Sequence, residues 1–373
     1  MCESVVERAR RIHDDLPVVD GHNDLPWAIR TKAGSSLEAA NPGTRLVGYH
    51  TDIPRLLSGG VGAQFWSVYV PAWCDHPLRD TLEQIDLVTR MAAAHPDHLT
   101  MAGTVEEVRS IRAAGRVACL LGAEGGHSIE GSLRALRMLH QLGVRYMTLT
   151  HADTIAWADS ATDDARHDGL TEFGHEVVRE MNRIGMVVDI SHVSVATMNA
   201  ALDTSRAPLM ASHSSAFALA PHPRNIPDDV IRRIADNGGV IMVNFYPPFL
   251  LRDLAAESIE MFAESRVLMA ELGDELAVDE ELQRRRGDVA DTGSVGDVVD
   301  HIEHIARIGG VNHVGLGSDF DGVDLLPTGL EDVSCYPNIT EELLRRGWAE
   351  TDARKVLGEN ALRVLEAAED TAD

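Results

Sequence analysis

Eight short apolar runs recur along the chain, and a segment long enough for a helix follows each of them. Turn residues bound these runs, which is typical of buried strands. They cover residues 17–20, 64–70, 117–122, 146–150, 186–190, 209–212, 240–245 and 313–318. Amphipathic stretches lie between them, at residues 81–95, 132–141, 171–184, 195–202, 227–236 and 298–308. This alternation predicts parallel strand pairing, and eight units predict closure into an α/β barrel of the (β/α)8, or TIM, type.

One stretch interrupts the alternation. Residues 251–291 are acidic and helical in composition, with the run Arg284-Arg285-Arg286 near their end. We expect a helical insertion near the barrel mouth, and the alternative is a solvated helix pair without a role. No linker-like composition divides the chain, so we expect residues 1–373 to form a single domain.

Residues able to bind metal or move a proton stand at the C-terminal ends of six predicted strands. They are His22 with Asp24, then Glu124, His151, His192, His213 and Asp319. Barrel enzymes place their chemistry at this end of the strands. The spacing His22-x-Asp24 projects an imidazole and a carboxylate from one face of a strand, although a surface pair is the alternative for these two alone.

The ring as a whole predicts a metal site. Zinc binds His nitrogen and carboxylate oxygen, and the ligands exceed what one tetrahedral ion needs. A bridging carboxylate such as Glu124 would let two ions share a water, lowering its pKa and producing a nucleophile at neutral pH. By contrast, His301 and His304 share one face of a predicted helix, and a solvated face is the preferred interpretation there.

Composition narrows the classes of partner and compartment. Of 373 residues, 59 are acidic and 33 basic, and the formal charge of −26 argues against nucleic acid or an anionic membrane as partner. No apolar window is long enough to span a bilayer, and residues 1–15 lack the apolar core of a signal peptide. Four cysteines lie far apart, without a Cys-x-x-Cys motif. We expect a cytoplasmic protein with reduced thiols.

Nine segments carry a family resemblance that runs across nearly the whole chain. They are Val-Asp-Gly-His-Asn-Asp-Leu-Pro-Trp at 19–27, Gly-Ala-Gln-Phe-Trp-Ser-Val-Tyr at 62–69, Gly-Ala-Glu-Gly-Gly-His at 122–127, Leu-Thr-His at 149–151, Asp-Ile-Ser-His at 189–192, Ser-His-Ser-Ser at 212–215, Arg-Asn-Ile-Pro-Asp-Asp at 224–229, Met-Val-Asn-Phe-Tyr at 242–246 and Gly-Ser-Asp-Phe-Asp-Gly at 317–322. The sequence resembles the membrane (renal) dipeptidases, which are zinc-dependent amidohydrolase-like barrels, and looks like a soluble bacterial-type member.

The resemblance implies a role for each residue and a binuclear centre with two zinc ions per chain. His22 and Asp24 would bind one ion, His192 and His213 the other, and Glu124 would bridge them. Asp319 would be the acid/base, His151 would stabilise the carbonyl oxygen, and Arg224 would bind the substrate carboxylate. Asp319 and His151 would thus also contact the substrate. A homodimer is implied too.

The predicted function is that of a metalloprotease acting on dipeptides, including L-Xaa-D-Xaa, by attack of a metal-bridging hydroxide. Two alternatives remain: a deaminase or other amidohydrolase acting on a cyclic amide or nucleobase, and a small-molecule binding protein without turnover. The chain also departs from the family pattern. Asp153 stands where vertebrate members have a disulfide cysteine, and Phe249 where some relatives have a tyrosine.

Overall fold

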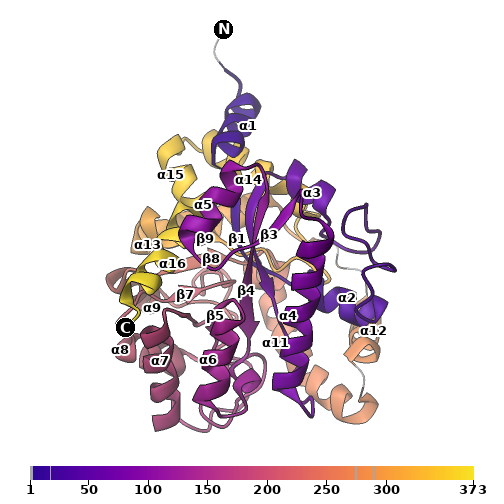
Figure 1. Cartoon of the computed structure of the whole chain (residues 1–373), viewed down its shortest axis with the longest axis vertical. Helices are drawn as coiled ribbons and strands as arrows, with labels where there is room; N and C mark the ends of the chain where they lie inside the picture. The colour runs from indigo at the N-terminus through magenta and orange to yellow at the C-terminus, as the bar shows by residue number, and fades with distance from the viewer. Residues whose placement is uncertain (1–2, 17, 274, 288, 290) are drawn as a thin grey trace.

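Eight parallel strands close into a barrel in the computed structural model, which describes residues 3–16, 18–273, 275–287, 289 and 291–373 (Figure 1). These strands are β1 (Val18–Asn23), β2 (Val61–Ser67), β4 (Val117–Glu124), β5 (Val144–Thr148), β6 (Val187–Asp189), β7 (Met210–Ala211), β8 (Val240–Val243) and β9 (Val314–Leu316). β1 pairs with β2 on one side and β9 on the other, and β2 pairs with β4, which closes the ring. The predicted TIM barrel is confirmed.

The sequence did not indicate one further strand. β3 (Leu99–Met101) pairs with the first residues of β4, beside the barrel wall. Three residues are too few to show a period of two, so no pattern could have revealed it. Pro17, the predicted first residue of the first strand, lies outside the described residues.

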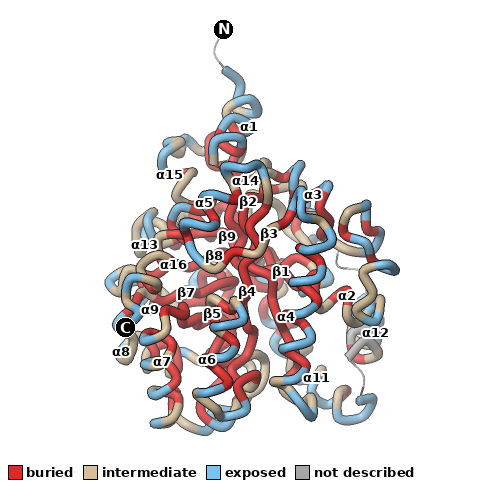
Figure 2. The backbone as a smooth tube through the Cα atoms, in the orientation of Figure 1, coloured by how far each residue is buried: buried red, intermediate tan, exposed pale blue. Residues whose placement is uncertain are grey.

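The six predicted amphipathic stretches are helices. They are α4 (Pro77–Ala94), α6 (Leu133–Gln141), α7 (Glu172–Ile184), α8 (Val195–Thr204), α9 (Asp228–Asn237) and α13 (Val295–Gly309). α7 shows why they begin and end where they do: the Thr171 hydroxyl accepts from the Gly174 amide at its start, and Gly185 takes a left-handed φ of 78° at its end. Figure 2 shows buried strands inside a layer of helices whose outer faces are exposed.

Other helices complete the shell and the loops. They are α1 (Val5–Asp15), α2 (Leu25–Ala33), α3 (Ile53–Ser58), α5 (Val105–Ala113), α10 (Pro247–Leu250), α14 (Tyr336–Arg345) and α15 (Glu350–Arg354), with the short turns Gly126–Ile129, Val311–His313, Val333–Cys335 and Lys355–Glu359. No helix in the described part of the chain combines the length and apolar character needed to cross a membrane.

α16 (Asn360–Thr371) covers the end of the barrel at which the strands begin. Its Leu362, Val364 and Leu365 share one buried cluster with Val19 of β1 and Val187 of β6. These apolar side chains fill the end of the barrel at which the strands begin. The opposite end, where the strands finish, is left for the polar residues of the candidate site.

The interrupting stretch contains α11 (Arg252–Leu272) and α12 (Glu275–Arg286). Arg266 of α11 donates a hydrogen bond to the Thr162 carbonyl oxygen, in the loop after β5. Arg286 of α12 forms an ion pair of 2.5 Å with Asp324, in the loop after β9. The two helices therefore contact two loops at the C-terminal end of the barrel.

Candidate metal centre

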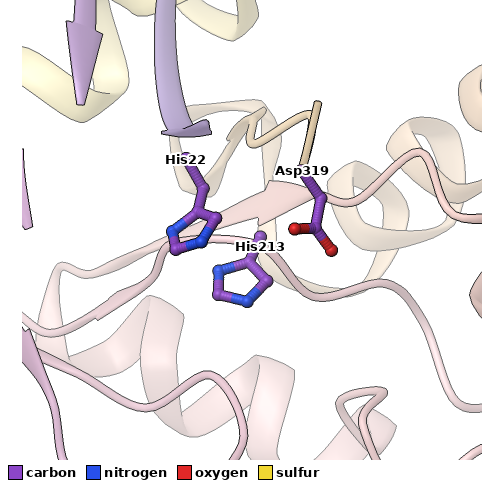
Figure 3. Close-up of side chains that lie close together, drawn as sticks. All are labelled: His22, His213 and Asp319. Carbon is purple, nitrogen blue, oxygen red and sulfur yellow. The ribbon is translucent and has the colours of Figure 1, made fainter. Parts of the chain in front are cut away.

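Seven of the eight predicted site residues stand at the C-terminal ends of barrel strands. His22 lies in β1 with Asp24 just beyond it, and Glu124 is the last residue of β4. The loops that follow β5, β6, β7 and β9 provide, respectively, His151, His192, His213 and Asp319. Figure 3 shows His22, His213 and Asp319 converging although their elements are distant in the chain.

Glu124 lies between two groups of potential ligands. Its Oε2 is 3.3 Å from His22 Nε2, which is itself 3.2 Å from Asp24 Oδ2. Its Oε1 is 3.1 Å from His192 Nε2 and 3.4 Å from His213 Nε2. Within each group the ligand atoms lie within 4.8 Å of one another. One carboxylate thus faces a His–Asp pair with one oxygen and a His–His pair with the other.

Buried polar atoms without partners indicate what this arrangement can hold. His22 Nε2 and Asp24 Oδ1 are buried and have no hydrogen-bond partner among the described residues. Buried polar atoms are normally paired, and an unpaired one requires an explanation. His192 Nε2 and His213 Nε2 also point at each other across 2.8 Å. Nitrogen and carboxylate donors that converge in this way fit metal ions of the zinc type.

The protonation states of Glu124, His192 and His213 suit metal binding. Burial opposes a charge on Glu124, but the imidazole of His22 and its neighbours hold the pKa of this carboxyl well below its usual range. Burial lowers the pKa of His192 and His213 well below the usual histidine value. A carboxylate and neutral imidazoles are the forms that bind metal.

Asp319 has a different environment from the other carboxylates. Burial, together with the negative charges of Asp24 and Glu124, raises the pKa of Asp319 to about 7, although His22 opposes the shift. Its Oδ2 accepts a hydrogen bond of 2.8 Å from Asn244 Nδ2. A carboxyl with a pKa near neutrality can both accept and return a proton.

Two of the site residues have a strained backbone. His192 and Asp319 have φ of 65° and 66°, in the left-handed region that costs energy for residues other than glycine. Hydrogen bonds hold both conformations: Ala161 donates to the His192 carbonyl at 2.7 Å, and the Asp319 amide donates to the His22 carbonyl at 3.2 Å. The surrounding loops therefore impose the directions of these side chains.

His151 and Arg224 lie beside the ligand groups. His151 Nε2 is 3.9 Å from Glu124 Oε1, and its side chain is 23% exposed, more than those of the ligands. Removal from water lowers the pKa of His151 to about 4, so the ring is neutral at pH 7 and keeps one N–H to donate. Arg224 is buried, with Nη2 donating to the His213 carbonyl at 3.2 Å and its guanidinium carbon 5.2 Å from the Phe249 ring centroid. Burial lowers the pKa of Arg224 to about 10, which still leaves it charged.

Sequence reasoning missed the polar residues that support the ligands. Ser67 donates to Glu124 Oε2 at 3.1 Å, and Tyr146 lies 2.8 Å from His22 Nδ1. Both lie inside apolar runs, where only the folded structure reveals their partners. Three supporting residues do stand in segments that carry the family resemblance: Ser67 in Gly-Ala-Gln-Phe-Trp-Ser-Val-Tyr, Asp189 in Asp-Ile-Ser-His and Asn244 in Met-Val-Asn-Phe-Tyr. That resemblance was the sequence signal for them.

The interpretation of His301 and His304 as a solvated face is wrong. The His301 side chain is 1% exposed, accepts from the Ala216 amide at 2.9 Å and donates to the Leu250 carbonyl at 3.0 Å. Its helix, α13, packs between α9 and α14, so this face points inward. Neither histidine belongs to a group of potential metal ligands found among the described residues.

Comparisons with known proteins agree with this geometry. The family model described as membrane dipeptidase, peptidase family M19, matches residues 6–373. Dipeptidase aclJ of Aspergillus oryzae is 42% identical over 371 residues, which cover 96% of this chain and 79% of that protein. Dipeptidase tcpJ of Claviceps purpurea is 40% identical over 364 residues, or 95% of this chain and 77% of that protein.

A solved structure is also similar. It is a metallopeptidase from Rhodobacter sphaeroides, liganded with a phosphinate mimic of the dipeptide L-Ala-D-Ala. It is 27% identical with a TM-score of 0.77, and the match covers 95% of this chain and 99% of that one. From the barrel, the convergent ligands and these matches, we conclude that the chain belongs to the membrane dipeptidase family, peptidase family M19.

Proposed function

We propose that this metal-dependent dipeptidase uses two zinc ions and accepts L-Xaa-D-Xaa dipeptides among its substrates. The activity follows from the family, whereas the identity and number of the ions and the residue roles are our proposal. The proposed ligands are His22, Asp24, Glu124, His192 and His213.

The observation that carries this proposal is the position of Glu124. Each of its oxygens lies 3.1–3.4 Å from the nitrogen of a different ligand group. A carboxylate so placed can be shared by two neighbouring ions, as in binuclear hydrolases. Zinc held by these residues would supply an acidified water and a positive charge to polarise the scissile carbonyl.

Asp319 then handles the proton. Its carboxylate removes a proton from the attacking water and carries it to the amine that leaves when the amide bond breaks. A pKa near 7 suits both transfers, and the bond from Asn244 Nδ2 to Oδ2 leaves Oδ1 to receive the proton. The left-handed backbone of Asp319 directs this carboxyl toward His22 and His213.

His151 and Arg224 bind the substrate. The partly exposed imidazole of His151 donates its N–H to the carbonyl oxygen as negative charge develops there. The Arg224 guanidinium pairs with the C-terminal carboxylate, to which a planar fork is suited. With one cation at one end and the ligand carboxylates near the other, the site measures the length of a dipeptide. The phosphinate mimic bound by the Rhodobacter sphaeroides relative supports a site of this size.

A substrate panel tests the proposal. Purified, zinc-loaded protein is assayed against L-L and L-D dipeptides, tripeptides and cyclic amides, with metal counted by elemental analysis. We expect free amino acids from dipeptides alone and two zinc ions per chain. Turnover of cyclic amides without dipeptide cleavage would replace the proposal with the other amidohydrolase class, and binding without turnover would leave a binding protein.

We also propose a cytoplasmic homodimer. Cys74, Cys119 and Cys335 are free among the described residues, which suits a reducing compartment. The dimer rests on the family resemblance. Light scattering of the full chain measures its mass, and a monomer at micromolar concentration would contradict it.

A further inference from the structure

We propose that Tyr146 is a positioning residue, whose hydroxyl fixes the tautomer and orientation of His22 so that Nε2 faces the metal. This inference rests on the proposed metal centre. It concerns a residue of the barrel wall that contacts a ligand without being one.

The hydrogen bonds of the Tyr146 hydroxyl determine the tautomer. Its oxygen lies 2.8 Å from His22 Nδ1 and 3.1 Å from the Gly21 carbonyl oxygen. A hydroxyl has one proton, and a carbonyl can only accept. The proton therefore goes to Gly21, and the hydroxyl oxygen accepts the N–H of His22 Nδ1. This leaves the lone pair on Nε2, directed toward Asp24 and Glu124.

The Tyr146 ring is fixed in place. It is completely buried in β5, and its centroid lies 5.2 Å from that of Phe65. Gly122 of β4 also lies against it, and an added Cβ there would lie 2.0 Å from the Tyr146 ring carbon that bears the hydroxyl. Gly122 therefore leaves the space that the tyrosine occupies, two residues before Glu124. Strand β4 thus provides the ligand Glu124 and also the space for Tyr146, which orients the ligand His22.

His213, in the ligand group with His192, is also held by a hydroxyl at its Nδ1, but there the hydroxyl is bonded to an acidic side chain. His213 Nδ1 is 2.8 Å from the Ser212 hydroxyl, which donates to Asp189 Oδ2 at 2.7 Å. The series of hydrogen bonds that starts at His213 thus ends on the acidic side chain of Asp189. The series that starts at His22 ends on the neutral carbonyl of Gly21. Removing the Tyr146 hydroxyl therefore changes the orientation of His22 without removing a charge.

The test is Tyr146→Phe, which keeps the ring and deletes only the hydroxyl. Loss of a partner that orients a ligand costs about 10–100-fold in metal affinity. We expect one zinc site to weaken by about that factor and the other to keep wild-type affinity, measured by chelator competition on metal-depleted protein. In the zinc-loaded wild type, we also expect the His22 Nδ1 proton to exchange slowly by NMR, and to exchange faster in the variant.

The matched control is Thr340→Val. It deletes another buried hydroxyl that pairs with an imidazole, that of His13 at 2.7 Å, in a different part of the molecule. We expect the Thr340→Val variant to have a lower thermal stability than the wild type and an unchanged zinc affinity. A folded Gly122→Ala variant should show the same loss of zinc affinity, because the added methyl displaces the Tyr146 ring. The zinc affinity of Tyr146→Phe decides the inference.

The outcomes separate this inference from the proposed function. If Tyr146→Phe binds both ions like the wild type, the positioning role is wrong and the dipeptidase proposal stands. If the wild type itself binds no zinc, both are wrong. If Thr340→Val weakens zinc binding as strongly as Tyr146→Phe, a general loss of packing explains the effect and the inference is overturned.

Discussion

Asp319 is the one described residue of the centre that combines three particular properties. Its backbone is left-handed, its Oδ2 accepts from Asn244, and burial raises its pKa to about 7. Asp321, two residues further on, has the same φ of 66°, but its Oδ1 accepts from the His50 amide at 2.8 Å. Two aspartates with the same backbone conformation thus face different environments, and this pair allows a controlled experiment.

For Asp319→Asn we expect kcat to fall by about 10²–10⁴-fold, because an amide cannot accept and return the proton. Metal content and KM should change little. Asp321→Asn is the control, expected to keep kcat within a few-fold. Steady-state kinetics with elemental analysis decide, and wild-type turnover by Asp319→Asn would show that another group carries the proton.

For Arg224→Lys we expect KM for dipeptides to rise by about tenfold or more, because a single ammonium cannot form the paired bonds of a guanidinium. The change in kcat should be smaller. Arg233→Lys is a control that should leave both constants unchanged, because Arg233 of α9 pairs with Asp203 of α8. An unchanged KM in Arg224→Lys would remove Arg224 from the carboxylate site.

At the scale of elements, glycines bring the ligand loops together. A Cβ at Gly317, after β9, would lie 1.8 Å from the Ser212 carbonyl oxygen, and one at Gly21 of β1 would lie 2.6 Å from the same atom. The backbone before His213 thus approaches two strands more closely than any side chain allows. This explains the glycines in Asp-Gly-His and Gly-Ser-Asp, which a metal site alone does not require.

For Gly317→Ala we expect a loss of about 1–3 kcal/mol of unfolding free energy, because the contact is with backbone that must shift. Zinc affinity should fall as well. Gly296→Ala is the control, since its added methyl meets only the ends of Ser294 and Arg346 side chains, at 3.3 and 3.4 Å. Urea denaturation compares the two, and equal stability of both variants would contradict the packing argument.

His301 of α13 makes stability depend on pH. Burial lowers its pKa to about 4, below the value near 6.5 of an unfolded histidine. The unfolded chain therefore binds a proton that the folded chain does not, and stability from this group falls as pH drops from about 6.5 to 4. His301→Gln cannot titrate, so we expect a shallower slope, measured by denaturation at several pH values. Parallel slopes for both proteins would contradict this account.

Repeated strands and helices could be predicted from the sequence because their patterns are local. The same holds for the strand-end residues, since parallel strands bring their C-terminal ends to one side of a barrel. Tyr146 and Ser67 could not be assigned, because their partners lie on other strands. His301 was misjudged because the pattern of one helix does not reveal that other helices cover its polar side. The single-domain organisation and the residue roles stay predictions.

At the scale of the molecule, a chain with a formal charge of −26 encloses a centre built from imidazoles and carboxylates. Such a charge draws cations toward the protein. The unpaired His22 Nε2 and Asp24 Oδ1 mean that the folded chain without metal leaves buried polar atoms unsatisfied. Metal should therefore stabilise the whole barrel.

We expect chelator treatment to lower the unfolding temperature and added zinc to restore it. Ligand linkage gives about 4 kcal/mol per site when free zinc exceeds its dissociation constant a thousandfold. Magnesium is the control, because it prefers an octahedron of oxygens and should restore little. Calorimetry of the full chain gives the comparison, and superimposable curves with and without chelator would argue against a resident metal.

The closure of the barrel between β1 and β9 also determines when, during synthesis of the chain, the enzyme can become active. Ser318 donates hydrogen bonds to Asp20 across 298 positions of sequence. During synthesis the ribosome therefore releases His22 long before Asp319 exists, and α16, which covers the far end of the barrel, comes later still. A chain that ends before β9 lacks both the closed barrel and Asp319, the proposed acid, even where it already carries all five proposed ligands. We therefore expect such an incomplete chain to have no dipeptidase activity.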